Sequence, residues 1–223
     1  MNAHTKLHRQ HIRCEIESIT PLDVLEAQHR TDALAWVDSG VELIRQAKPA
    51  TPPKHLVSYF AVVDGDHILL VDHKNAQLWL PAGGHVEVDE HPRDTVRREL
   101  LEELGFAAAH EIGPPLMITY TETVGLTAGH TDVSLWYVVQ AKRSQAIHFD
   151  ANEFNAVRWF AFADVPLTCS DPHIGRFMDK LRRTPLRGEC RQSPLTTAVT
   201  YGAESNGKLI PGGHRYESTV SRA

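Results

Sequence analysis

Apolar residues in the middle of the chain recur in short blocks that are typical of β-strands. Residues 55–63 and 67–73 form two such blocks, and the Asp-Gly pair between them indicates a tight hairpin turn. Further blocks occupy residues 78–81, 116–126, 131–141 and 156–162. The pattern therefore predicts a sheet of short strands, several of them joined by connections of hairpin length.

Two other segments show the spacing of amphipathic helices. Over 92–104 the apolar residues form one stripe, and Gly105 is placed to end the helix. Residues 171–183 predict a later helix, with Asp171 as its N-cap and Pro172 at its first helical position.

The N-terminal part carries two signals. Apolar residues recur at near-helical spacing over about 20–47, with Thr20 as a plausible N-cap and Pro21 after it, so one or two amphipathic helices are expected there. Upstream, four metal-capable side chains are spaced so that they could meet on one helix face: His4, His8, His11 and Cys14. We favour a frayed polar terminus over a zinc site, because zinc motifs have a tighter sequence context.

These segments divide the chain into three parts. A proline-rich linker separates an N-terminal helical extension at 1–50 from a main domain at 54–184. Residues 185–223 are rich in Gly, Ser and Thr, and we expect a flexible or loosely docked tail. Strands around one acidic helix, with another helix near the end, predict an α/β fold: an α/β/α sandwich with a mixed sheet rather than a doubly wound parallel sheet.

The charge, cysteine content and hydropathy of the chain exclude several classes of function. The 223-residue chain has a formal net charge of −5, which gives no support to an extended nucleic-acid-binding surface. Its three cysteines include no C-x-x-C pair, so we expect no disulfide framework and a cytoplasmic location. No segment approaches the roughly 18 consecutive apolar residues of a membrane span, and no membrane partner is expected.

The helix at 92–104 concentrates negative charge on one face. Glu99, Glu102 and Glu103 stand at positions i, i+3 and i+4, where like charges repel by roughly 0.2–0.5 kcal/mol per pair. Taken alone, such a run is typical of a solvated acidic surface. A divalent cation would also compensate it, and Mg²⁺ prefers oxygen ligands of this kind.

The glutamates belong to a longer pattern. From Gly84 to Phe106 the sequence reads G-x5-E-x7-R-E-U-x-E-E-x-G-U without a gap, where U is a bulky apolar residue. This segment closely resembles the Nudix box of Nudix hydrolases, and the resemblance covers about residues 55–183. It implies an α/β/α sandwich and the Mg²⁺-dependent hydrolysis, with Mn²⁺ as a possible substitute, of a nucleoside diphosphate linked to another group X.

The resemblance also implies roles for individual residues. Glu99, Glu102 and Glu103 would ligate the metal together with the carbonyl group of Gly83, although Glu99 could instead be the general base. Arg98 would hold a glutamate carboxylate in place. In the loop before the last strand, Glu153 matches the place of a further ligand or base, with Asp150 as the fallback.

The substrate is less well defined by the sequence. His85 is placed to meet a phosphate, and His130 and Asp132 could form hydrogen bonds with a base or sugar. Trp79 could stack on a base, although core packing is the simpler interpretation. A (deoxy)nucleoside triphosphate or similar small nucleotide is the leading substrate class.

Other functions remain open at this point. Nucleotide sugars and dinucleoside polyphosphates are the alternative substrates. A diphosphate isomerase of the same fold ranks lower, because all three cysteines lie outside the central strands, and so does a non-catalytic nucleotide-sensing module, because the box carboxylates are complete. The N-terminal helices or the tail could also form a homodimer.

Overall fold

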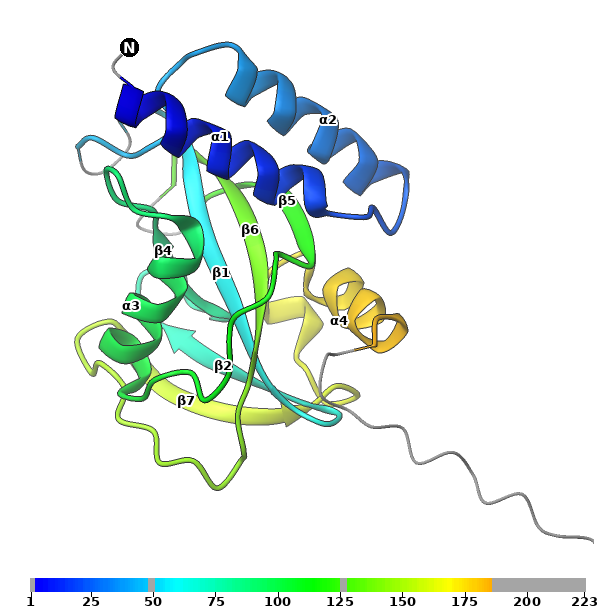
Figure 1. Ribbon diagram of the computed structural model, residues 1–223. Coiled ribbons are helices and arrows are strands. Elements are labelled where there is room, and N and C mark those ends of the chain that lie inside the picture. Colours follow the sequence, from blue (N-terminus) through cyan, green and yellow to red (C-terminus); the bar gives the residue numbers. More distant parts are fainter. Residues whose placement is uncertain (1–2, 48–50, 125–127, 186–223) are drawn as a thin grey trace, which may run out of the picture. The chain divides into compact units, whose positions relative to one another are not determined.

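A mixed seven-stranded sheet lies at the centre of this computed structural model, which describes residues 3–47, 51–124 and 128–185 (Figure 1). The helices of the described part are α1 (Ala3–Ser18), α2 (Val24–Asp38), α3 (Pro92–Leu104), α4 (Ile174–Arg183) and the short 3-10 helix η2 (Leu167–Cys169). The strands are β1 (Lys54–Asp64), β2 (His67–His73), β3 (Leu78–Leu80), β4 (Ala82–His85), β5 (Met117–Glu122), β6 (Thr131–Gln140) and β7 (Phe154–Ala161).

The strand order is β3-β2-β1-β6-β5, with β4 paired to β1 and β7 paired to β2. The long central strands β1 and β6 run parallel, from Lys54 opposite Thr131 to Val63 opposite Gln140. The other pairings are antiparallel, including the predicted hairpin in which Asp64 faces His67. The mixed sheet expected from the sequence is confirmed.

Helices cover both faces of this sheet (Figure 1). In β6, Leu135 and Tyr137 belong to the core that also contains residues of α1, α2 and α3. Trp136, between them, stacks on Phe177 of α4 with the ring centroids 5.0 Å apart. Since successive side chains of a strand point to opposite faces, α4 lies across the sheet from α3, and the expected α/β/α sandwich is confirmed.

The N-terminal segment is ordered as α1, so the prediction of a frayed terminus is wrong. Ile12 and Ile16 are fully buried in the core, and the guanidinium group of Arg9 donates to the carbonyl groups of Val37 and Val41 at 2.7 and 2.6 Å. Packing of this kind stabilises helices whose own sequence is polar. Among the side chains that the structure describes, those of His8, His11 and Cys14 form no metal-capable group.

Helix α2 is shorter than the predicted range of 20–47. It begins after Asp23, whose carboxylate accepts a hydrogen bond of 2.9 Å from the backbone N–H of Glu26, so neither Thr20 nor Pro21 has its predicted helical position. Gly40, at φ 79°, follows the end of the helix. Residues 41–47 then form a loop, in which Leu43 and Ile44 are buried.

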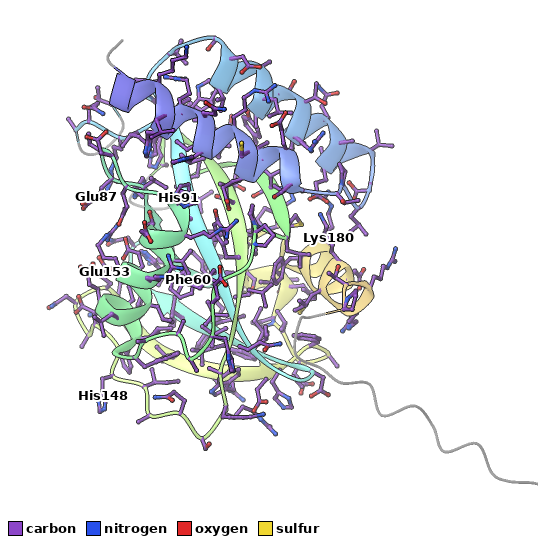
Figure 2. The ribbon with its side chains drawn as sticks, viewed as in Figure 1. Phe60, Glu87, His91, His148, Glu153 and Lys180 are labelled. Atoms are coloured by element: carbon purple, nitrogen blue, oxygen red, sulfur yellow. The ribbon has the colours of Figure 1, made fainter. Side chains whose placement is uncertain are left out.

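Helix α4 also starts later than predicted, at Ile174 with His173 as its N-cap. Asp171 is not the cap; its buried carboxylate accepts a hydrogen bond of 2.7 Å from the backbone N–H of His173. The ammonium group of Lys180 pairs with the buried carboxylate of Glu26, which ties α4 to α2 (Figure 2).

Strand β4 was not predicted. Its sequence, Ala-Gly-Gly-His, lacks the β-branched and aromatic residues that mark strands, and pairing with β1 forms it instead. All but the first residue of the predicted tail at 185–223 lie outside the described residues, so the proposed three-part division of the chain stays a prediction. In the described part of the chain, no helix combines the length and apolar character needed to cross a membrane.

Candidate active site

Two glycines of β4 bring its backbone close to β1 and α3. Gly83 pairs with Tyr59 and Gly84 with Ser58 in the antiparallel ladder. Gly83 has φ 154°, and a Cβ atom there would overlap the carbonyl oxygen of Ser58. A Cβ atom on Gly84 would overlap the carboxylate of Glu99. Glycine at both positions therefore lets α3 place its acidic face directly against the β4 backbone.

Three carboxylates converge beside these glycines of β4. Glu103 is buried and accepts a hydrogen bond of 3.0 Å from the backbone N–H of Gly83. Burial, and then the charges of Glu99 and Glu153, raise the pKa of Glu103 to about 9. The pKa of Glu99 is also raised, first by burial and further by Glu102 and Glu153. The group therefore carries more negative charge than its surroundings neutralise.

The loop that carries Glu153 caps the end of α3. The backbone N–H of His148 donates to the carbonyl group of Leu104 at 3.0 Å, and that of Asp150 donates to the carbonyl group of Glu103 at 3.1 Å. These bonds satisfy carbonyl groups that a helix end leaves without partners. Figure 2 shows Glu153 beside α3, so the loop brings this carboxylate to the glutamates of the helix.

Arg98 joins the helix to the preceding loop. Its Nε and Nη2 atoms donate to the two carboxylate oxygens of Glu90 at 2.9 and 3.0 Å, and Nη2 also donates to the carbonyl group of His85 at 3.2 Å. Its Nη1 atom donates to Glu99 at 2.7 Å and to Glu102 at 3.2 Å. Arg98 thus fixes the carboxylate of Glu99, whereas Glu102 remains largely exposed at the rim.

The donor set fits a hard divalent cation. Glu99, Glu103 and Glu153 offer carboxylate oxygens within a small region, and Mg²⁺ and Mn²⁺ are bound in proteins by oxygen donors of this kind. The raised pKa of Glu103 is a second indication, because a bound cation would offset the repulsion that favours its protonated form. The residues present can therefore hold such an ion.

The side chains predicted to bind substrate separate into two places. His85, His130 and Asp132 lie together, and His55 of β1 joins them. Trp79 lies in β3, where its ring packs edge-on against Phe160 at 5.1 Å. The substrate role of all four predicted residues stays a prediction.

Sequence reasoning missed two residues near this region. His55 stands directly opposite Asp132 in the parallel pairing of β1 and β6. Its one sequence signal was its place as a polar residue at the start of an apolar block. Arg45, in the loop after α2, has its pKa lowered by burial, while Asp132 and then Glu99 act in the opposite direction. A cationic side chain from the N-terminal part therefore lies within electrostatic range of the acidic cluster.

Comparisons with known proteins address the family of this chain. The family model described as NUDIX domain matches residues 54–181. A MutT-like protein from Streptomyces ambofaciens is 27% identical over 139 residues, which cover 61% of this chain and 84% of that protein.

Two solved structures are similar to this chain. The MutT NUDIX hydrolase from Burkholderia pseudomallei has a TM-score of 0.50 and 24% identity, over 57% of this chain and 98% of its own, and shows the same fold. A NUDIX family hydrolase from Clostridium perfringens has a TM-score of 0.46 and 20% identity, over 58% and 97% of the two chains. The chain therefore belongs to the NUDIX domain family and is a Nudix hydrolase, an enzyme that acts on phosphoric anhydride bonds.

Proposed function

We propose that the protein uses Mg²⁺, or Mn²⁺ in its place, to hydrolyse a (deoxy)nucleoside triphosphate or a similar small nucleotide. The observation that carries this proposal is the convergence of Glu99, Glu103 and Glu153 beside Gly83 and Gly84 of β4. Such a cluster can hold a cation against the negatively charged phosphates of a substrate.

In this proposal Glu99 and Glu103 are the principal metal ligands, together with the carbonyl group of Gly83. Glu102 reaches the site from its exposed position at the rim, and Glu153 reaches it from the loop at the end of α3. An ion held by these residues would neutralise charge on phosphate oxygens and would favour deprotonation of the attacking water.

Arg98 acts as a positioning residue. Its guanidinium group contacts three carboxylates and the carbonyl group of His85, so it holds the loop and the helix in one arrangement. Removal of its charge would leave Glu99 free to change rotamer and would increase repulsion within the cluster. Because Glu90 is engaged by both Arg98 and the hydroxyl group of Thr95, it supports the loop rather than the metal.

We assign the general base to Glu153 rather than Glu99. The carboxylate of Glu99 accepts a hydrogen bond of 2.7 Å from Arg98 and lies against the backbone of Gly84, so it is already engaged in holding the cluster together. Glu153 lies on an exposed loop segment where water can reach it. It is therefore placed to take the proton of the attacking water molecule as that water approaches phosphorus.

A substrate panel tests the reaction. Nucleoside and deoxynucleoside triphosphates, nucleotide sugars, ADP-ribose and dinucleoside polyphosphates are incubated with Mg²⁺ or Mn²⁺, and the phosphate-containing products are identified. We expect anhydride cleavage that is fastest for a triphosphate and lost in Glu103→Gln. Wild-type turnover in Glu103→Gln would contradict the assignment of Glu103 to the active site. Preferred cleavage of another class of compound on the panel would replace the triphosphate as the assigned substrate.

The compartment and oligomeric state are further parts of the proposal. Cys14 and Cys169 are free and exposed, which supports the reducing cytoplasm predicted from the sequence. A homodimer remains a prediction.

A further inference from the structure

A second group of metal-capable side chains lies beside the glutamate cluster. It consists of His55 at the start of β1, His85 at the end of β4, His130 just before β6, and Asp132 within β6. One ligand atom from each residue lies within 4.8 Å of the others. The Nε2 atoms of His55, His130 and His85 are 3.3, 3.4 and 4.0 Å from Oδ1 of Asp132.

The sheet itself brings these residues together. His55 pairs directly with Asp132 in the parallel ladder between β1 and β6. His85 pairs with Val57, which is two residues from His55 and on the same side of β1. Three of the four residues therefore lie on adjacent strands, His130 directly precedes one of these strands, and such a support suits a metal site.

The hydrogen bonds of His55 turn a lone pair toward Asp132. Its Nδ1 atom is 2.8 Å from the carbonyl oxygen of Pro52, and because a carbonyl group can only accept, Nδ1 carries the proton. In the neutral ring Nε2 then has a lone pair. The side chain of His55 is 0% exposed, and neither its Nε2 atom nor Oδ1 of Asp132 has a hydrogen-bond partner. A lone pair and a carboxylate oxygen repel each other at this distance unless a proton or a metal ion lies between them.

His130 is held in the same way. The hydroxyl group of Thr123 donates to the carbonyl group of His130 at 3.1 Å, so its oxygen is available to accept from Nδ1 of the same histidine, also at 3.1 Å. This leaves Nε2 of His130 to face Asp132. Metal-binding histidines show this arrangement, in which the outer ring nitrogen donates to a protein oxygen and orients the inner one.

We propose that His55, His85, His130 and Asp132 bind a divalent transition-metal ion of the Zn²⁺ type. Three imidazole nitrogens and one carboxylate oxygen form a donor set that suits Zn²⁺. With bond lengths of about 2.0–2.1 Å, a tetrahedral ion separates its ligand atoms by roughly 3.3–3.4 Å. Two of the distances to Asp132 already have this value, and the wider separations, which reach up to 4.8 Å, would contract when the ion binds.

This site differs in chemistry from the glutamate cluster, whose donors are all oxygen atoms. Four protein ligands leave no open position on a tetrahedral ion, and this is typical of structural zinc. The ion would clamp β1, β4 and β6 next to Gly83 and Gly84. The inference does not depend on the proposed substrate or on the role of the glutamates.

The test uses the full-length chain carrying Glu103→Gln, which weakens the other site, after treatment with a chelator. Zn²⁺ binding is followed by calorimetry, and Co²⁺ is added separately because its visible absorption is intense only in tetrahedral coordination. We expect one equivalent of Zn²⁺, a tetrahedral Co²⁺ spectrum and a higher melting temperature with Zn²⁺. Asp132→Asn and His130→Gln should each weaken Zn²⁺ binding by more than about 100-fold, since loss of an outer-shell partner alone costs about 10–100-fold.

His11→Gln is the matched control, because His11 is an exposed histidine whose ring lies 5.7 Å from that of His91. It should bind Zn²⁺ as the parent does. Circular dichroism of each metal-free variant shows whether it is folded. If His130→Gln does not fold, the nearly isosteric Asp132→Asn still tests the site. Parental Zn²⁺ affinity in folded Asp132→Asn, or loss of binding in His11→Gln, would overturn the proposal.

Discussion

Arg93, at the start of α3, donates from two guanidinium nitrogens to the carboxylate of Glu15 in α1, at 3.1 and 2.6 Å. The same carboxylate accepts a hydrogen bond of 3.0 Å from the hydroxyl group of Tyr137 in β6. Burial, and then the charge of Glu15, raise the pKa of Tyr137 well above its ordinary value. One buried carboxylate thus connects the N-terminal part with both the catalytic helix and the central sheet.

Glu15→Gln should destabilise the protein. The glutamine amide cannot neutralise the charge of Arg93. Hydrogen bonds to charged groups contribute about 1.5–3 kcal/mol each to stability. We expect a loss of about 1–3 kcal/mol in the free energy of unfolding, measured by urea denaturation. Glu17→Gln, on an exposed part of the same helix, should change it by less than about 0.5 kcal/mol. Equal effects of the two substitutions would contradict the role assigned to Glu15.

Glu103→Gln should inactivate the enzyme and stabilise its metal-free form. With a folded pKa of about 9 and an unfolded value near 4.5, the folded state holds a proton that the unfolded state has released at neutral pH. The stability of the metal-free wild type should therefore fall as pH rises from about 5 to 9, by at most roughly 3 kcal/mol at pH 7. Glutamine removes this penalty.

Thermal melts in chelator at pH 5, 7 and 9 check this expectation. The melting temperature of Glu103→Gln should exceed that of the wild type by a margin that grows with pH, while kcat falls by orders of magnitude. Glu102→Gln, at the exposed rim, is the control and should melt as the wild type does. A margin that shrinks with rising pH would show that Glu103 is not protonated in the folded protein.

Glu153→Gln and Glu99→Gln should change different kinetic properties of the enzyme. If Glu153 is the base, its amide variant loses about 10²–10⁴-fold in kcat but still binds the activating metal nearly as well. Glu99→Gln should raise the metal concentration needed for half-maximal rate. Metal titrations of initial rate for both variants separate the two roles, and the opposite outcome would move the base to Glu99.

Gly84→Ala should reduce activity while the fold is retained. The added methyl group would occupy the place of the Glu99 carboxylate and push that side chain away from the metal position. Gly113→Ala is the matched control, since a Cβ atom there meets no other atom within 4 Å. Wild-type kcat/KM in Gly84→Ala would mean that Glu99 does not need its observed position.

The core of the site could be predicted because it lies within one continuous segment. Helical periodicity places Glu99 and Glu103 on one face, and a helix with a proline at its start and a glycine at its end is predictable from local sequence. By contrast, the meeting of His55 with Asp132 depends on the register of two strands far apart in the chain. Local patterns contain no information about that register.

The N-terminal part was harder to predict for a related reason. Helix α1 is polar on average, and its stability comes from Ile12, Ile16 and Glu15, whose partners lie in distant elements. The end of α2 was overestimated because Leu43 and Ile44 continue the apolar pattern, although they are buried from a loop. Burial alone does not distinguish a helix from a packed loop.

The parallel pairing of β1 with β6 also constrains the order in which the chain can fold. Residues such as Leu56 and Val133 become neighbours only after the ribosome has synthesised the whole intervening segment. Until then α1 and α2 have no completed sheet on which to bury their apolar side chains. Contacts of such long sequence separation slow folding, so we expect α1 and α2 to pack only once β6 has emerged.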